Sequence, residues 1–159
     1  MTDFQNKTAW ITGASSGIGK ALAIAFADSG ARVVLSGRRE DALRAVANEL
    51  PTDSLVLPFE VTDFAALASK VEDAWAWAGR LDILVCSAGT AGVEFLSPNE
   101  EAMALENIPL ETWDRTIDVN LKGIFLCVRA AIPHFKKQQR GKIINISSAA
   151  GRQGRELLP

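Results

Sequence analysis

Glycines and serines at a fixed spacing carry the clearest chemical signal in this sequence. They lie in segment 12–19 (TGASSGIG), between an apolar run at 8–11 and an alanine-rich run at 20–27. This order predicts a strand, a glycine turn and a helix. Free N–H groups at the start of such a helix, with the positive end of its dipole, bind the pyrophosphate of a dinucleotide. The candidate contacts are Gly13, Ser15, Ser16, Gly17, Ile18 and Gly19.

Each glycine of this segment has its own expected use. Gly13 allows backbone angles that a side chain disfavours, Gly17 leaves room for a ligand against the backbone, and Gly19 lets the helix pack close to the strand. The spacing G-x-x-x-G-x-G departs from the commoner G-x-G-x-x-G, and a tight turn without a ligand is the alternative interpretation. Its place at a first strand-to-helix turn favours the dinucleotide site.

The elements that must position this turn alternate between short β-branched runs and longer helical patterns. This alternation predicts an α/β fold, a Rossmann-like doubly wound parallel sheet in the strand order 3-2-1-4-5. Pro58 favours an edge position for the third strand, and Pro133 is expected to kink or end the last helix. The predicted strands are 8–11, 31–36, 54–59, 81–86 and 141–147, and the predicted helices are 20–27, 38–50, 63–78 and 112–137.

Composition and charge narrow the function classes. The 159 residues are 48% hydrophobic and 23% charged, which fits one soluble domain spanning residues 1–159. The net charge of −2 offers no electrostatic case for binding nucleic acid. No apolar run reaches the roughly 20 residues of a membrane span, and no leader sequence is recognisable, so neither membrane nor secretion is expected and a cytoplasmic location is the default. Cys86 and Cys127 show no metal-ligand spacing, so no metal is expected, and Cys127 is predicted to lack a partner.

Four separated segments together resemble one family, the short-chain dehydrogenase/reductases. They are Thr12–Gly19, Leu81–Gly89, Asp118–Gly123 and Gly141–Gly151, in the family's order and across nearly the whole chain. The resemblance implies a Rossmann-like fold, an NAD or NADP cofactor, a small-molecule alcohol or carbonyl substrate, hydride transfer between the two, and a homo-oligomer when complete.

The resemblance also assigns two catalytic residues. Asn120 matches the family's asparagine, which holds a water that links the catalytic lysine to solvent. The alternative for Asn120 is a polar tie between a helix backbone and the neighbouring strand. Ser148 matches the serine that hydrogen-bonds the substrate oxygen, and Ser147 is the competing choice.

The family's catalytic tyrosine and lysine, spaced Y-x-x-x-K, are expected just beyond Pro159, and the sequence contains no tyrosine. The family's last strands are missing too, so the chain is interpreted as an N-terminal, cofactor-binding part that is incomplete at its C-terminus. His134, beside Pro133 and expected on the surface, is a poor substitute for the missing acid. The alternatives are a non-catalytic nucleotide-binding fragment and one half of a two-chain assembly.

Further positions set the expected cofactor. NAD-preferring relatives carry an acidic residue at the end of the second strand, where this chain has Gly37 followed by Arg38. A guanidinium there can hold a 2′-phosphate, so NADP is expected, with NAD as the alternative. The competing interpretation of Arg38 is a solvated turn paired with Glu40 or Asp41.

The remaining candidate cofactor contacts come from two segments that differ from the family pattern. Glu60, followed by Val61, replaces the aspartate that touches the adenine amino group. Ser87 replaces an asparagine, while Ala88 and Gly89 let the nicotinamide ribose approach the backbone. Residues 89–109 are expected to form a long loop with a short helix near 100–105, serving either substrate specificity or only as a surface insertion.

Overall fold

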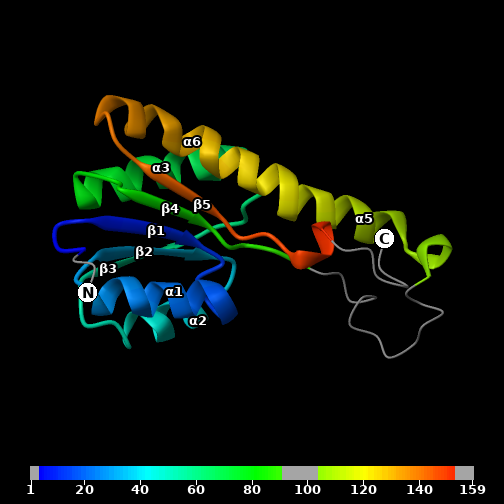
Figure 1. Cartoon of the computed structure of the whole chain (residues 1–159), viewed down its shortest axis with the longest axis horizontal. Helices are drawn as coiled ribbons and strands as arrows, with labels where there is room; N and C mark the ends of the chain where they lie inside the picture. The colour runs from blue at the N-terminus through cyan, green and yellow to red at the C-terminus, as the bar shows by residue number, and fades with distance from the viewer. Residues whose placement is uncertain (1–3, 91–103, 153–159) are drawn as a thin grey trace.

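Five short strands pair in parallel and form the frame of the molecule (Figure 1). The computed structural model describes residues 4–90 and 104–152. The strand order is β3-β2-β1-β4-β5, which confirms the predicted topology and the edge position of the third strand. The strands are β1 (Thr8–Thr12), β2 (Arg32–Gly37), β3 (Ser54–Pro58), β4 (Ile83–Cys86) and β5 (Lys142–Asn145).

Helices cover both faces of this sheet. Helices α1 (Gly17–Asp28) and α2 (Glu40–Ala47) lie on one face, and α3 (Phe64–Ala78) and α6 (Gly123–Lys137) lie on the other (Figure 1). Successive side chains of a strand point to opposite faces, so the inner strands β2, β1 and β4 each contribute residues to two separate hydrophobic cores. This double burial explains why β4 is wholly apolar and why β1 and β2 are apolar in their middle residues.

The ends of α3 illustrate how local sequence sets an element. The Asp63 side chain accepts a hydrogen bond from the Ala66 N–H at 3.0 Å, which caps the first turn. Gly79 takes a left-handed conformation (φ +70°) just past the last turn, as helix C-termini commonly require. The predicted helix at 63–78 is confirmed. Helix α2 ends at Ala47, earlier than predicted, because the next residues form tighter turns.

The long helix predicted at 112–137 is three consecutive segments. Helix α5 (Leu110–Ile117) leads into a π-helical segment, η3 (Asp118–Lys122), and then into α6. Pro133 lies inside α6, which continues to Lys137, so the expectation that this proline ends the helix is wrong.

The region after β4 is only partly described. The short helix predicted near 100–105 falls mostly within 91–103, outside the described residues. Leu105–Asn107 forms a single 3₁₀ turn, η2, and Ala149–Gly151 forms another, η4. No helix in the described ranges is both long and apolar enough to cross a membrane.

Two side chains differ from expectation because α6 packs closely on its neighbours. His134 is buried rather than on the surface: its Nε2 lies 3.2 Å from Glu72 Oε1, and its ring lies 4.8 Å from that of Trp75, both on α3. Cys127 does have a partner, since its thiol is hydrogen-bonded to that of Cys86 at the end of β4.

Candidate functional site

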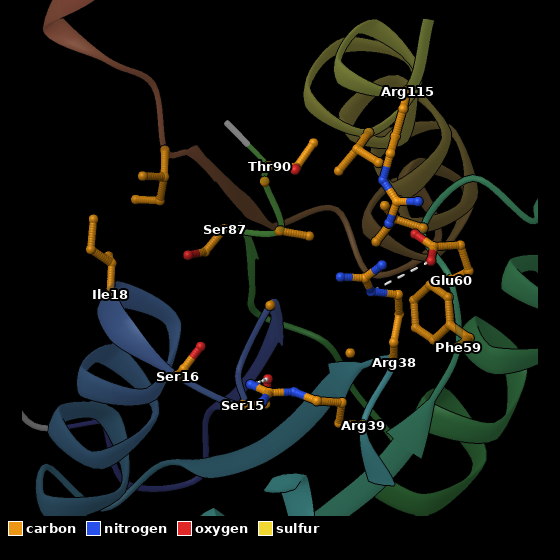
Figure 2. A pocket seen from close by; sticks show the side chains of 17 residues that line it. Ser15, Ser16, Ile18, Arg38, Arg39, Phe59, Glu60, Ser87, Thr90 and Arg115 are labelled. Carbon is orange, nitrogen blue, oxygen red and sulfur yellow. Dashed lines mark hydrogen bonds and ion pairs between the residues drawn. The ribbon is translucent and has the colours of Figure 1, made fainter. Parts of the chain in front are cut away.

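A cavity of about 320 Å³ opens at the carboxyl ends of the strands (Figure 2). It lies beside the turn after β1, where ligands bind in open α/β sheets. The structure gathers there most of the predicted cofactor contacts, namely Gly13, Ser15, Ser16, Ile18, Arg38, Glu60, Val61, Ser87, Ala88 and Gly89. Gly17 and Gly19 are absent from this lining and shape the turn instead.

The glycines of the turn are required for different physical reasons. Gly13 has φ +69°, and a Cβ there would lie 2.8 Å from the backbone of Ala88. A Cβ on Gly19 would overlap the carbonyl oxygen of Gly13, so the close approach of helix to strand is as expected. Gly17 has φ +55° with nothing within 4 Å of a Cβ, so its backbone conformation, and not crowding, calls for glycine.

The floor of the cavity is tied together by the Thr12 hydroxyl. Thr12 Oγ1 accepts hydrogen bonds from the N–H groups of Ser87 (3.2 Å) and Ala88 (3.3 Å), and it donates to the Val85 carbonyl (3.4 Å). Residue 87 is thus bound to β1 through its backbone N–H. The replacement of the family's asparagine by serine at this position leaves that hydrogen bond in place. This arrangement holds the segment after β4 against the glycine turn.

One end of the cavity is strongly basic. Arg38 Nε lies 3.6 Å from Glu60 Oε2, and Arg39 Nη2 donates to Ser15 Oγ at 3.3 Å. The alternative pairing of Arg38 with Glu40 or Asp41 is therefore wrong. Arg115 of α5 also lines this end, where Figure 2 shows it beside Arg38 and Glu60. Three guanidinium groups and a single carboxylate line the cavity, which suits an anionic ligand.

Several lining residues were not predicted. Arg39 directly follows Arg38, so its place at the same strand end was a usable signal. Arg115 had no comparable signal, because the direction of its side chain depends on how α5 is rotated about its own axis relative to the cavity. The others are Phe59, Thr90, Val119 and Ile146, together with Gly37, which the sequence analysis used only to choose between the cofactors.

The two predicted catalytic residues lie near the cavity without lining it. Asn120, in η3, clamps the backbone of Thr90: its Oδ1 accepts from the Thr90 N–H at 2.8 Å, and its Nδ2 donates to the Thr90 carbonyl at 2.7 Å. Asn120 thus ties η3 to the loop after β4, and not to the neighbouring strand as its alternative had it, since Thr90 lies four residues beyond that strand. Ser148 is exposed, and its carbonyl accepts from the Gly151 N–H at 3.3 Å in η4, two residues beyond the lining residue Ile146.

The two thiols lie below this floor. Cys86 and Cys127 are each about 1% exposed, and they border a small hollow with Thr12 and Ala88. The hydrogen bond to Cys86 and the burial together raise the pKa of the Cys127 thiol, which therefore stays protonated. Across residues 4–90 and 104–152, no three His, Cys, Asp or Glu side chains are grouped to hold a metal ion.

Comparison with known proteins agrees with this arrangement. The family model described as short chain dehydrogenase matches residues 7–159. The chain belongs to the short-chain dehydrogenase/reductase family. It is 40% identical over 152 residues to an uncharacterized oxidoreductase of Staphylococcus aureus strain MW2, covering 95% of this chain and 62% of that relative. Members of the family are oxidoreductases, and the chain spans less than two thirds of this relative's length.

Two solved structures resemble the chain closely. A metagenomic short-chain oxidoreductase in complex with NADP has a TM-score of 0.84 at 34% identity, covering 98% of this chain and 68% of that one. The 3-ketoacyl-(acyl-carrier-protein) reductase of Brucella melitensis, complexed with NADH, has a TM-score of 0.88 at 34% identity, covering 98% and 62%. The two relatives hold different nicotinamide cofactors.

Proposed function

We propose that this chain supplies the cofactor site of an oxidoreductase that transfers a hydride between NADP(H) and an alcohol or carbonyl substrate. The observation that carries the choice of NADP is the end of β2. Gly37 occupies the position where an acidic residue would bind the ribose hydroxyls of NAD, and Arg38 and Arg39 follow it at the cavity wall. Paired guanidinium groups bind a 2′-phosphate through charge-assisted hydrogen bonds.

Arg39 is proposed as the principal 2′-phosphate ligand. Arg38 already faces Glu60 at 3.6 Å, so part of its charge is balanced. Arg39 contacts only a neutral hydroxyl of the turn, Ser15 Oγ, among the described partners, so its charge remains available to an anion. Arg39 is ranked above Arg38 because Glu60 pairs with Arg38 in this chain.

The rest of the cavity fits the other parts of such a cofactor. The turn at 12–19 and the start of α1 would hold the pyrophosphate, and Glu60 with Val61 would contact the adenine. Backbone at Ala88 and Gly89 would face the nicotinamide ribose. When bound, the cofactor supplies or accepts the hydride.

The remaining chemistry concerns the substrate oxygen. In this proposal Ser148 holds that oxygen by a hydrogen bond, and Asn120 fixes the backbone at Thr90 and positions a water for the proton path. The chain contains no tyrosine, so the phenol that exchanges the proton in this family is not among these 159 residues. The specific alcohol or carbonyl is not selected by the fold.

The cofactor proposal is tested by titrating the purified chain with NADP+ and with NAD+ in a calorimeter. We expect Arg39→Gln to weaken NADP+ binding by roughly tenfold or more and to leave NAD+ binding unchanged, because a charge-assisted hydrogen bond to the 2′-phosphate is lost. Arg44→Gln is the matched control, since Arg44 pairs with Glu40 on α2 and does not line the cavity. Equal weakening of both cofactors by Arg39→Gln would contradict the proposal, and so would tighter binding of NAD+ to the unaltered chain.

A further inference from the structure

Arg115 occupies a position that the proposed cofactor contacts leave unexplained. It lies on α5, which is far along the sequence from the glycine turn and the end of β2 on the opposite side of the cavity. Glu60, Arg115 and Val119 line both this cavity and a second depression of about 390 Å³, so these three side chains form the partition between the two. Figure 2 shows the Arg115 side chain reaching down from its helix toward Glu60 and Arg38.

Arg115 is not held in an ion pair within the described residues, although Glu111, Asp114 and Asp118 also line the second depression. No carboxylate of residues 4–90 or 104–152 forms an ion pair with it, whereas Arg38 faces Glu60 at 3.6 Å. The side chain is also exposed, so its planar guanidinium group is free to lie along a ligand. Such a group both attracts anions and stacks on aromatic rings.

The position of Arg115 favours the base over the phosphate. Arg39, the principal 2′-phosphate ligand proposed, reaches from the end of β2 to Ser15 of the glycine turn, whereas Arg115 approaches from α5 and lies with Arg38 on the side of Glu60. Glu60 is the proposed partner of the adenine amino group, so the base would lie at the wall that Glu60 and Arg115 share. A guanidinium on that wall would be placed to stack on a heteroaromatic ring bound there.

We propose that Arg115 is a cofactor-binding residue that stacks on the adenine base and thereby strengthens the binding of NADP and NAD alike. This inference rests on the proposed dinucleotide site. It separates two tasks at one end of the cavity. Arg39 discriminates between the cofactors by their phosphate, and Arg115 contributes to affinity through a feature that both cofactors share.

Calorimetric titration with fragments of the cofactor tests this role. The probes are adenosine 2′,5′-bisphosphate, which contains the base, and inorganic pyrophosphate, which does not. In Arg115→Met, which keeps the apolar stem and removes the guanidinium, we expect about fivefold weaker binding of the bisphosphate, the size of a typical stacking contact with a cation. Pyrophosphate binding stays within twofold. Arg115→Lys keeps the charge without the plane, and we expect it to lose most of the same affinity.

The controls separate stacking from general charge. Lys122→Met removes a positive charge from η3, outside the cavity lining, and should bind both probes as the unaltered chain does. Full affinity in Arg115→Lys, or equal weakening of both probes in Arg115→Met, would overturn stacking in favour of charge alone. Unchanged bisphosphate binding in Arg115→Met would overturn the inference and leave the proposed function intact. Failure of the unaltered chain to bind either probe would overturn the proposed function itself.

Discussion

Gly19 shows most directly how a single residue sets the cofactor turn. It lies in the first turn of α1, where alanine normally stabilises a helix relative to glycine by about 1 kcal/mol. Here a Cβ would overlap the carbonyl oxygen of Gly13, so the helix and the strand would have to separate. The local helix propensity and the packing therefore favour opposite residues, and packing decides.

We predict that Gly19→Ala destabilises the protein by about 2 kcal/mol, the cost of overpacking a backbone contact. Gly17→Ala is the matched variant, because a Cβ there meets nothing and only the left-handed backbone (φ +55°) is disfavoured, at about 1 kcal/mol. Urea denaturation of both variants measures the difference. A smaller loss in Gly19→Ala than in Gly17→Ala would show that the turn relaxes and that crowding is unimportant.

The two cysteines give a second prediction at the residue scale. Both thiols are almost fully buried, and the raised pKa of Cys127 keeps that thiol protonated and unreactive. We expect negligible reaction of the folded chain with 5,5′-dithiobis(2-nitrobenzoate) and release of two equivalents in guanidinium chloride. A rapidly reacting thiol in the folded protein would mean that the floor of the cavity opens readily.

At the scale of elements, the bounds of regular helices were predicted well, but the direction in which the faces of α5 point was not. The cap at Asp63 and the stop at Gly79 follow from local chemistry, so α3 was predicted at nearly its observed bounds. The π-helical segment η3 left no local signal. One extra residue per turn shifts the helical phase by about 100°, so the faces of α5 could not be deduced from an uninterrupted helix. Arg115 escaped prediction for this reason, as did the Thr90 clamp made by Asn120.

That clamp leads to a prediction about local order. Asn120→Ala removes the acceptor of the Thr90 N–H and the donor to the Thr90 carbonyl. One hydrogen bond contributes about 1 kcal/mol, so we expect the Thr90 amide to exchange its hydrogen about fivefold faster. Hydrogen exchange followed by NMR measures this, with the Ile11 amide in β1 as the internal control. Unchanged exchange at Thr90 would show that other contacts hold this segment and that the clamp is dispensable.

At the scale of the whole molecule, one carboxylate joins the starts of several strands. Asp82, which is 5% exposed, accepts from the Thr8 N–H at 3.0 Å and binds both Arg80 Nε (2.7 Å) and Arg80 Nη2 (2.6 Å). Arg140 Nε lies 3.5 Å away, just before β5. Burial alone would raise the pKa of Asp82, but the hydrogen bonds from Arg80 and Thr8 outweigh it, so the pKa lies below 3.8.

The depressed pKa fixes the sign of a pH dependence. The stability that ionised Asp82 contributes is complete above about pH 5 and is lost as the pH falls through its folded-state pKa. We predict that Asp82→Asn costs about 2 kcal/mol at pH 7, because Arg80, Arg140 and Lys7, whose Nζ lies 3.9 Å from Asp82 Oδ1, keep no carboxylate partner among the described residues. We expect this difference to shrink toward pH 3. Urea denaturation at pH 7, 5 and 3 checks it. A constant difference across this range would assign the cost to packing and not to charge.

The distance between the Asp82 network and the cofactor cavity has a consequence for how such a protein can change. The network lies at the amino end of β4, and the cavity opens at its carboxyl end, about 13 Å away at the rise of an extended strand. Free-energy effects of substitutions separated by more than about 10 Å usually add. Cofactor preference at Arg39 and cofactor affinity at Arg115 can therefore be redesigned while compensating stability is installed around Asp82. Substitutions at the carboxyl end of the sheet can thus change cofactor binding while substitutions at its amino end restore stability, so the scaffold can evolve readily.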